Sequence, residues 1–196
     1  MNNCYLDAEA VITFFRMTGR KHIFITGSRG SGKSHLVNNM LKHMSDSFNL
    51  LQSHRTDTPQ VVIKSNLVAD NKEFVIGVPR TSGINPASKG NNMTIIEDGF
   101  INCAIPAIDT HLDTTPERLF VIDELGYLES SCIPFQKAVE KLLDNSHVLA
   151  VIRKQSTEFL NRICNRKDVL VIDIDNTFET LSCIIMASGM SKRFGS

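Results

Sequence analysis

The sequence predicts a single α/β domain in which a mostly parallel sheet carries helices on both faces. Four largely apolar runs, at residues 22–26, 119–122, 148–152 and 169–174, are typical of strands buried on both faces. Segments with apolar residues at helical spacing separate them, as βα units require. The 196 residues, 42% of them hydrophobic, are enough to form one domain with a sizeable core.

Charge and cysteine content narrow the class of protein. The 21 basic and 21 acidic residues give no net charge, so we expect neither a general nucleic-acid footprint nor a membrane-surface footprint. Five cysteines, an odd number without a C-x-x-C pair, argue against a disulfide framework and against a zinc site. We find no apolar run of membrane-spanning length and no export signal, and therefore expect a cytoplasmic protein with reduced thiols.

The first predicted helix covers residues 7–17. Asp7 is a candidate N-cap, apolar residues follow at helical spacing, and Gly19 is a stop signal. We expect this helix to pack against the sheet through its apolar stripe, which consists of Ala10, Val11, Phe14 and Phe15.

A glycine-rich turn follows the run 22–26, and a helical pattern comes directly after it. The turn matches the phosphate-binding loop pattern G-x-x-x-x-G-K-[ST], also called Walker A. Its glycines let backbone N–H groups approach a triphosphate closely, and the helix adds the positive end of its dipole. The predicted nucleotide-binding residues are Gly27, Ser28, Arg29, Gly30, Ser31, Gly32, Lys33 and Ser34.

Two side chains of this loop have defined chemical roles. Lys33 supplies a positive charge for the β- and γ-phosphates of a nucleoside triphosphate. The Ser34 hydroxyl is placed to bind a Mg²⁺ ion that bridges the same phosphates. Lys33 is therefore a candidate catalytic residue, and Ser34 is a candidate metal ligand.

The middle of the chain carries weaker signals. Residues 45–59 are polar, and we expect a loop there. Two short β-type runs, 61–64 and 74–78, predict a hairpin-like excursion. A weakly helical stretch over 94–111 is expected to break near Pro106.

Some basic residues could reach the phosphates from outside the loop. The polar segment 79–92 is either a lid that brings Arg80 and Lys89 toward the nucleotide or an ordinary solvated loop. Arg153 and Lys154 directly follow a predicted strand, and this position would allow them to sense the γ-phosphate.

The second chemical stretch, RLFVIDELGYLE, covers residues 118–129. Asp123 follows the apolar run 119–122, and open α/β sheets bind ligands at the carboxyl ends of their strands. We interpret Asp123 as the second magnesium-site residue, which reaches the ion directly or through a water molecule. Glu124 faces the other way if the strand continues, so its carboxylate can orient or deprotonate the attacking water. Glu124 is therefore the second candidate catalytic residue.

The last third of the predicted domain alternates between helix and strand. Pro134 opens a helix that extends to residue 143, and a buried strand follows at 148–152. A short helix over 158–164 leads to the last buried strand at 169–174.

The segments GSRGSGKS, DELGYLE and HVLAVIRK together resemble the small P-loop nucleoside-triphosphatases described in thermophiles and as cancer-related enzymes. In that family the second motif reads D-E-I-G-x-M-E. The resemblance covers roughly residues 20–180. It implies a P-loop NTPase fold and Mg²⁺-dependent hydrolysis of ATP, GTP and other nucleoside triphosphates, with weak base preference. The chain departs from the family pattern at Tyr127, where the family has Lys, and in the segment PRTSGINPASKG.

The C-terminal residues CIIMASGMSKRFGS resemble the opening of a molybdenum-cofactor-type nucleotidyltransferase. The residues on that pattern are Gly189, Ser191, Arg193 and Gly195. We therefore expect a P-loop domain over residues 1–180, followed over 181–196 by the truncated start of a second domain. The alternative for 181–196 is a terminal helix of the first domain, because apolar residues there also have helical spacing.

Three functions fit these observations. The first is a hydrolase for nucleoside triphosphates such as ATP and GTP. The second is a P-loop kinase that passes the γ-phosphate to a small acceptor, and Glu124, which is placed for water, argues against it. The third is a nucleotide-binding module that regulates the covalently following nucleotidyltransferase domain, and it predicts binding without turnover.

Overall fold

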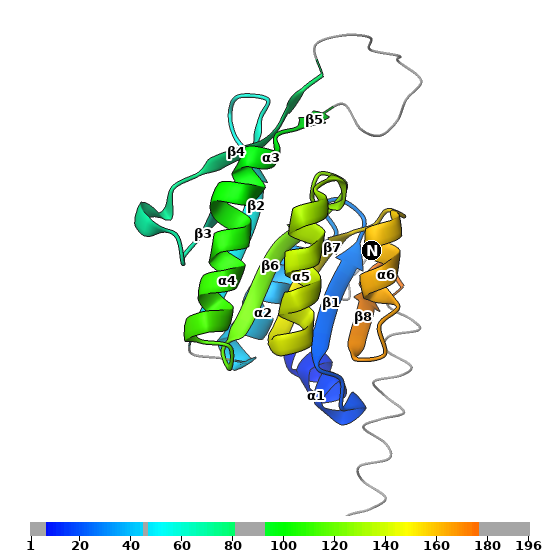
Figure 1. Ribbon diagram of the computed structural model, residues 1–196. Coiled ribbons are helices and arrows are strands. Elements are labelled where there is room, and N and C mark those ends of the chain that lie inside the picture. Colours follow the sequence, from blue (N-terminus) through cyan, green and yellow to red (C-terminus); the bar gives the residue numbers. More distant parts are fainter. Residues whose placement is uncertain (1–6, 45–46, 81–92, 177–196) are drawn as a thin grey trace, which may run out of the picture.

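A computed structural model describes residues 7–44, 47–80 and 93–176. These residues form one eight-stranded sheet in the order β5-β4-β3-β2-β6-β7-β1-β8 (Figure 1). The strands are β1 His22–Gly27, β2 Phe48–Arg55, β3 Val61–Ser65, β4 Phe74–Pro79, β5 Met93–Ile95, β6 Leu119–Leu125, β7 His147–Arg153 and β8 Val169–Asp173.

The sheet has a parallel part and an antiparallel extension. Strands β2, β6, β7, β1 and β8 are parallel, and β1 lies between β7 and β8. Strands β2, β3, β4 and β5 pair in antiparallel fashion. The four predicted buried strands and the predicted hairpin are therefore confirmed.

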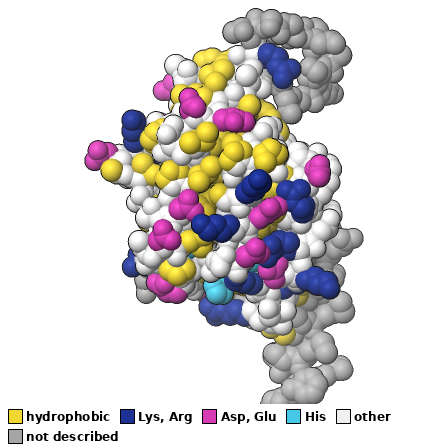
Figure 2. Space-filling view, viewed as in Figure 1, with side chains coloured by type: hydrophobic (Ala, Val, Ile, Leu, Met, Phe, Trp, Pro, Cys, Tyr) yellow, Lys and Arg dark blue, Asp and Glu magenta, His cyan; other side chains and the backbone are white. Residues whose placement is uncertain are grey.

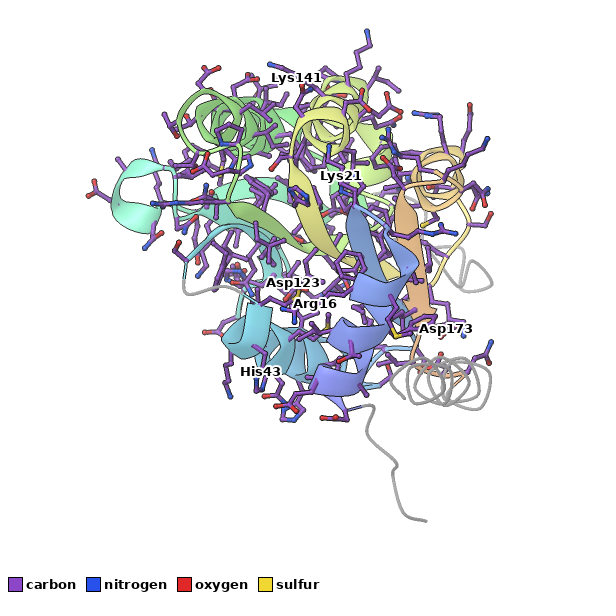
Figure 3. All side chains as sticks on the ribbon, turned by 90° about the horizontal axis from the view of Figure 1, so that it is seen from below. Arg16, Lys21, His43, Asp123, Lys141 and Asp173 are labelled. Carbon is purple, nitrogen blue, oxygen red and sulfur yellow. The ribbon has the colours of Figure 1, made fainter. Side chains whose placement is uncertain are left out.

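Helices cover both faces of the sheet, as the sequence predicts. Figure 3 shows α1 and α2 on one side of the sheet and α4, α5 and α6 on the other. Each layer encloses its own apolar cluster, one around Val11, Val37 and Met40 and the other around Phe100, Phe135 and Phe159. The helical segments are α1 Ala8–Thr18, α2 Lys33–Met44, α3 Glu97–Gly99, the π-helical turn η2 Phe100–Ala104, α4 Ile105–Thr114, α5 Ile133–Asn145, α6 Glu158–Cys164, and the 3₁₀ turns η1 Ala69–Asn71 and η3 Glu129–Ser131.

The ends of α1 show why the sequence predicts this helix. The Asp7 carboxylate accepts a hydrogen bond from the Ala10 N–H at 3.2 Å, which caps the N-terminus. Gly19 adopts φ +64° after the last turn, a left-handed conformation that glycine tolerates without strain.

The loop predicted over residues 45–59 is wrong, because β2 runs from Phe48 to Arg55. Its polar residues conceal the strand in the sequence. Asn49 is 3% exposed and donates hydrogen bonds to His111 and Thr115, so a polar side chain occupies a core position. Such a residue is compatible with a strand only when tertiary partners satisfy it, and the local sequence does not reveal those partners.

The break predicted near Pro106 is also wrong. Strand β5 occupies Met93–Ile95, and helical structure then continues from Glu97 to Thr114. Pro106 lies in the first turn of α4, directly after the π-helical turn η2. A wider turn at this place accommodates the missing N–H of proline, so the chain continues as a helix.

Two expectations lie outside the described residues and stay predictions. The first is the lid segment with Lys89, and the second is the nucleotidyltransferase-like or helical end over 181–196. Within the described part, Cys103, Cys132 and Cys164 are free thiols. No helix of that part combines the length and apolar character that crossing a membrane requires. Figure 2 shows basic and acidic side chains interspersed on the face that it presents.

Candidate active site

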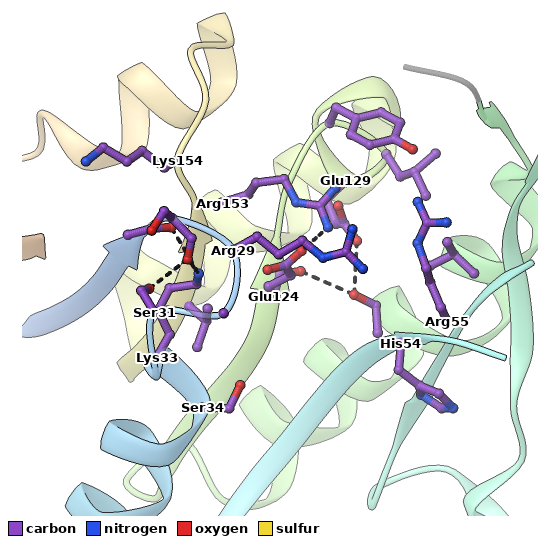
Figure 4. A pocket seen from close by; sticks show the side chains of 18 of the residues that line it. Arg29, Ser31, Lys33, Ser34, His54, Arg55, Glu124, Glu129, Arg153 and Lys154 are labelled. Carbon is purple, nitrogen blue, oxygen red and sulfur yellow. Dashed lines mark hydrogen bonds and ion pairs between the residues drawn. The ribbon is translucent and has the colours of Figure 1, made fainter. Parts of the chain in front are cut away.

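The phosphate-binding loop opens into a large cavity at the carboxyl ends of β1, β6 and β7 (Figure 4). Its volume is about 1060 Å³, which is at the upper end of the range for ligand sites. All eight predicted nucleotide-binding residues, Gly27 to Ser34, line it, and Glu124 lines it as well. The structure thus brings the two predicted chemical stretches together.

The loop has the backbone geometry that its glycines allow. Gly30 and Gly32 adopt φ +77° and +93°, which other residues rarely do. The Lys33 Nζ donates hydrogen bonds to the carbonyl oxygens of Gly27 at 3.0 Å and Ser28 at 2.8 Å. Helix α2 begins at Lys33, so its positive end faces the cavity beside the lysine charge.

A carboxylate that the sequence analysis did not assign braces the outer part of the loop. Asp175 accepts hydrogen bonds from the Ser28 N–H at 2.7 Å and the Ser28 hydroxyl at 3.0 Å. Lys154 Nζ lies 2.9 Å from carboxylate oxygens of both Asp175 and Asp173. The hydrogen bond from Lys154 is the main cause that lowers the pKa of Asp175. Lys154, which also lines the cavity, therefore supports the loop through this carboxylate.

Glu124 and Arg153 form an ion pair inside the cavity. The Glu124 side chain is 25% exposed, and that of Arg153 is 43% exposed. The guanidinium carbon of Arg153 also lies 5.6 Å from the ring centre of Tyr127, within the range of a cation–π contact. Figure 4 shows Glu124 between the loop residues Lys33 and Ser34 on one side and His54 and Arg55 on the other.

Asp123 lies beside the cavity and is not among its lining residues. Figure 3 shows it on the side of the sheet that α2 covers. Burial, followed by the nearby Glu124 charge, raises the pKa of Asp123, whereas a hydrogen bond with Gln52 and the Lys33 charge act in the opposite direction. Asp123 therefore shares the electrostatic environment of Lys33 and Glu124.

The donor set at this place suits Mg²⁺. Magnesium in nucleotide sites is held by one or two protein oxygens together with phosphate oxygens and water molecules. Ser34 offers a hydroxyl on the cavity wall, and Asp123 offers a carboxylate near Lys33. Among the described residues no group of three or more His, Cys, Asp or Glu side chains is arranged to hold a metal ion.

Glu129 is the second residue that the sequence analysis did not assign. It lies on the cavity wall but is 5% exposed. Its Oε2 accepts a hydrogen bond from the Gly126 N–H at 2.9 Å, and its Oε1 accepts one from the Ser53 hydroxyl at 3.3 Å. Burial raises the pKa of Glu129 to about 7. The motif DELGYLE contains this residue, but its burial against β2 has no signal in the sequence.

The antiparallel extension forms the far wall of the cavity. It lines the cavity with one cation, Arg55, and with apolar surface from Val61, Pro79 and Met93. His54 lines the same wall and lies 3.2 Å from Glu73. Arg80 follows Pro79 at the end of β4 and is exposed. The cavity therefore continues beyond Glu124, away from the phosphate-binding loop.

Two solved structures, one from Aquifex aeolicus and one human, have the same fold. The crystal structure of THEP1 from Aquifex aeolicus superposes with a TM-score of 0.62 at 18% identity, covering 82% of this chain and 96% of that one. The solution structure of a human cancer-related nucleoside triphosphatase gives 0.57 at 18% identity, covering 84% and 97%. At these identities the likeness shows a shared fold, the P-loop NTPase fold that the sequence predicts.

Sequence comparison reaches the same group. Nucleoside-triphosphatase THEP1 of Thermotoga sp. (strain RQ2) is 26% identical over 155 residues, covering 78% of this chain and 86% of the relative. Its counterpart in Thermotoga maritima is 23% identical over 154 residues, covering 78% and 86%. The sequence profile of the NTPase family matches residues 22–181. Since this match spans most of the chain and includes both chemical stretches, the chain belongs to the NTPase family.

Proposed function

We propose that this protein hydrolyses nucleoside triphosphates, including ATP and GTP, to the diphosphate and phosphate with the help of Mg²⁺. The observation that carries the proposal is one cavity in which a complete phosphate-binding loop faces the Glu124 carboxylate. The names of the Thermotoga relatives, nucleoside-triphosphatase, support it.

The loop would bind the triphosphate. Its N–H groups and the N-terminus of α2 attract the phosphate charge, and Lys33 exchanges its contacts with the Gly27 and Ser28 carbonyls for phosphate oxygens. Ser34 and Asp123 would hold Mg²⁺, which neutralises charge that develops on the phosphate oxygens. These residues position the nucleotide and stabilise its charge.

Glu124 would act on the water molecule. Its carboxylate lies on the cavity wall between the loop and the far wall. From there it would face the water molecule that attacks a terminal phosphate bound by the loop. It can accept a proton from that water or orient it by a hydrogen bond. Arg153, now paired with Glu124, supplies a positive charge close to the reacting phosphate.

The decisive experiment measures phosphate release from ATP, GTP and CTP with Mg²⁺. We expect Lys33→Ala to reduce phosphate release on the order of a hundredfold or more, because the loop loses the positive charge that binds the phosphates. Lys42→Ala is the matched control, since Lys42 lies exposed on the same helix and contacts Asn39. Chelation of Mg²⁺ should abolish the release. Equal rates for the wild type and Lys33→Ala would refute the proposal.

The far wall of the cavity supports one alternative, a kinase that transfers the γ-phosphate to a small acceptor. Arg55, Val61 and Met93 offer space and a cation beyond Glu124, where an acceptor would bind. Parallel assays of ADP and phosphate distinguish the two reactions. Hydrolysis yields both products in equal amounts, whereas transfer in the presence of a metabolite mixture yields ADP in excess. Tight nucleotide binding with neither product would indicate a regulatory module.

A further inference from the structure

The Glu129 carboxylate accepts hydrogen bonds that hold the backbone around Glu124. The Gly126 N–H, two residues after Glu124, binds Glu129 Oε2. On the neighbouring strand the Ser53 hydroxyl lies 3.3 Å from Glu129 Oε1 and 3.4 Å from the carbonyl oxygen of Glu124 itself. The backbone around Glu124 is thus tied to Glu129 directly at Gly126, and a second time through Ser53, whose single hydroxyl proton is shared between Glu129 and the Glu124 carbonyl.

The Glu124 side chain needs such support. Among the contacts of the described residues, its carboxylate pairs with Arg153, whose long side chain is 43% exposed. A partly exposed ion pair holds a side chain only weakly. The direction of Glu124 in the cavity therefore depends on its backbone, which the buried Glu129 carboxylate fixes.

We propose that Glu129 is a positioning residue for Glu124: by bridging the Gly126 N–H and the Ser53 hydroxyl, it holds the turn after β6 so that the Glu124 carboxylate faces the reacting phosphate. This inference rests on the proposed function. It assigns to Glu129 no contact with the nucleotide, and its effect on the rate is exerted through Glu124.

The charges around Glu129 give the arrangement a pH dependence. Glu124 faces it from β6, Arg153 from β7 and Tyr127 from its own turn. Because burial raises the pKa of Glu129 to about 7, the group changes charge in the neutral range. The neutral acid keeps both hydrogen bonds, since its O–H can donate to Ser53 while its other oxygen accepts from Gly126. The ionised form adds a negative charge that competes with Glu124 for Arg153.

Three substitutions separate geometry from charge. Glu129→Gln keeps the length of the side chain and both hydrogen bonds, and Glu129→Asp keeps the charge but is shorter by one methylene. Glu129→Ala removes both the charge and the hydrogen bonds. We expect Gln to retain kcat within about threefold, and Asp and Ala to lower it on the order of tenfold, with KM for Mg-ATP unchanged because the loop is untouched. Because ionised Glu129 competes for Arg153, it leaves the Glu124 carboxylate freer to accept a proton. We therefore expect kcat to rise from pH 6 to pH 8 in the wild type, with a component that Glu129→Gln lacks.

A double-mutant cycle tests whether Glu129 acts through Glu124. In a Glu124→Gln background the further change Glu129→Ala should cause no additional loss of kcat, since the group that it positions is already gone. An equal loss in both backgrounds overturns the proposal, as does a Glu129→Gln variant that is as slow as Glu129→Ala. Ser53→Ala, a smaller change, should lower kcat in the same direction and covers the case in which Glu129→Ala does not fold.

One readout is independent of turnover. Amide hydrogen exchange at Gly126 should accelerate in Glu129→Ala and stay slow in Glu129→Gln, because the N–H loses its acceptor only in the first variant. Unchanged exchange in Glu129→Ala contradicts the proposal even if the enzyme is active. Absence of Lys33-dependent phosphate release in the wild type contradicts the proposed function and leaves the exchange result to judge Glu129.

Discussion

The two ends of the parallel sheet both carry buried polar side chains, but they use them differently. At the amino end, Asn49, His111 and Ser146 are 3%, 0% and 1% exposed and bind one another and the backbone. At the carboxyl end, the buried Glu129 lines an open cavity together with the more exposed Glu124 and Arg153. The difference teaches that burial of a polar group marks a reacting site only where the group also faces space for a ligand.

At the amino end, hydrogen bonds link three buried side chains in a row. Asn49 Nδ2 donates to His111 Nδ1 at 2.8 Å, so the imidazole proton is on Nε2, which donates to Ser146 Oγ at 2.6 Å. Ser146 Oγ in turn donates to the Pro116 carbonyl at 2.8 Å. Burial lowers the pKa of His111, which keeps the ring neutral. These hydrogen bonds join β2, α4 and the residue between α5 and β7.

The largest expected effect falls on the rate at the carboxyl end. Glu124→Gln should lower kcat on the order of a hundredfold, because an amide cannot accept the proton of water, while nucleotide binding persists. Steady-state kinetics and titration with a nucleotide should show this split. Unimpaired turnover would remove Glu124 from the role of base. If Glu124→Gln lowered the melting temperature as much as a core variant does, the carboxyl end would serve stability as the amino end does, and the contrast between the two ends would be wrong.

The next largest effect falls on stability at the amino end. His111→Ala should lower the free energy of unfolding by about 3 kcal/mol, because it leaves a cavity and deprives Asn49 and Ser146 of their partner. Denaturant titration measures this loss, and KM and kcat of the folded fraction should not change. A fall in kcat without a loss of stability would mean that the amino end contributes to chemistry.

A smaller expected effect is the pH dependence of folding stability, which has opposite signs at the two ends. Burial lowers the pKa of His22 to about 4, so the unfolded state takes up a proton between about pH 6.5 and pH 4 and the folded state does not. The contribution of His22 to the free energy of unfolding should therefore fall by about 2 kcal/mol between pH 7 and pH 5, and His22→Leu should abolish this component. Glu129, with its raised pKa, has the opposite sign: its contribution is lost as pH rises toward 7 and above.

Comparison of wild type with His22→Leu at each pH isolates the histidine, because the Glu129 contribution cancels in the difference. Urea titrations at pH 5, 6 and 7 are sufficient. If both proteins lose the same stability on acidification, His22 is not the group that titrates.

The smallest expected effect concerns the brace on the loop. Asp175→Asn keeps an oxygen that can accept from the Ser28 N–H but loses the charge that attracts Lys154. KM for Mg-ATP should rise by less than about threefold, since exposed ion pairs contribute little, and kcat should stay constant. A tenfold change in kcat would mean that the brace takes part in the chemistry of Glu124.

Much of this arrangement could be predicted from the sequence, for identifiable reasons. The phosphate-binding loop depends on residue types at fixed spacing, and the buried strands β6 to β8 are continuous apolar runs, so both are visible locally. Asp123 and Glu124 could be assigned because they end such a strand. Their roles stay predictions, whereas their placement beside the loop is now seen.

The rest depends on contacts between distant segments. The buried Glu129 carboxylate receives a hydrogen bond from Ser53, which lies 76 positions away in the sequence, and no local pattern indicates this contact. Asp175 meets Ser28 across 147 positions. Strand β2 was hidden because its polar residues are satisfied by partners from α4 and from the turn after β6.

The register of strand β2 affects both ends of the sheet at once. Asn49 and Ser53 are four residues apart, so they point to the same face, with the buried Leu51 between them. Asn49 belongs to the hydrogen bonds with His111 at the amino end, and Ser53 belongs to the hydrogen bonds with Glu129 beside Glu124. A slip of β2 by one residue would turn both to the other face. The alignment of a single strand thus sets folding and catalysis together, and neither can be tuned by shifting β2 without loss of the other.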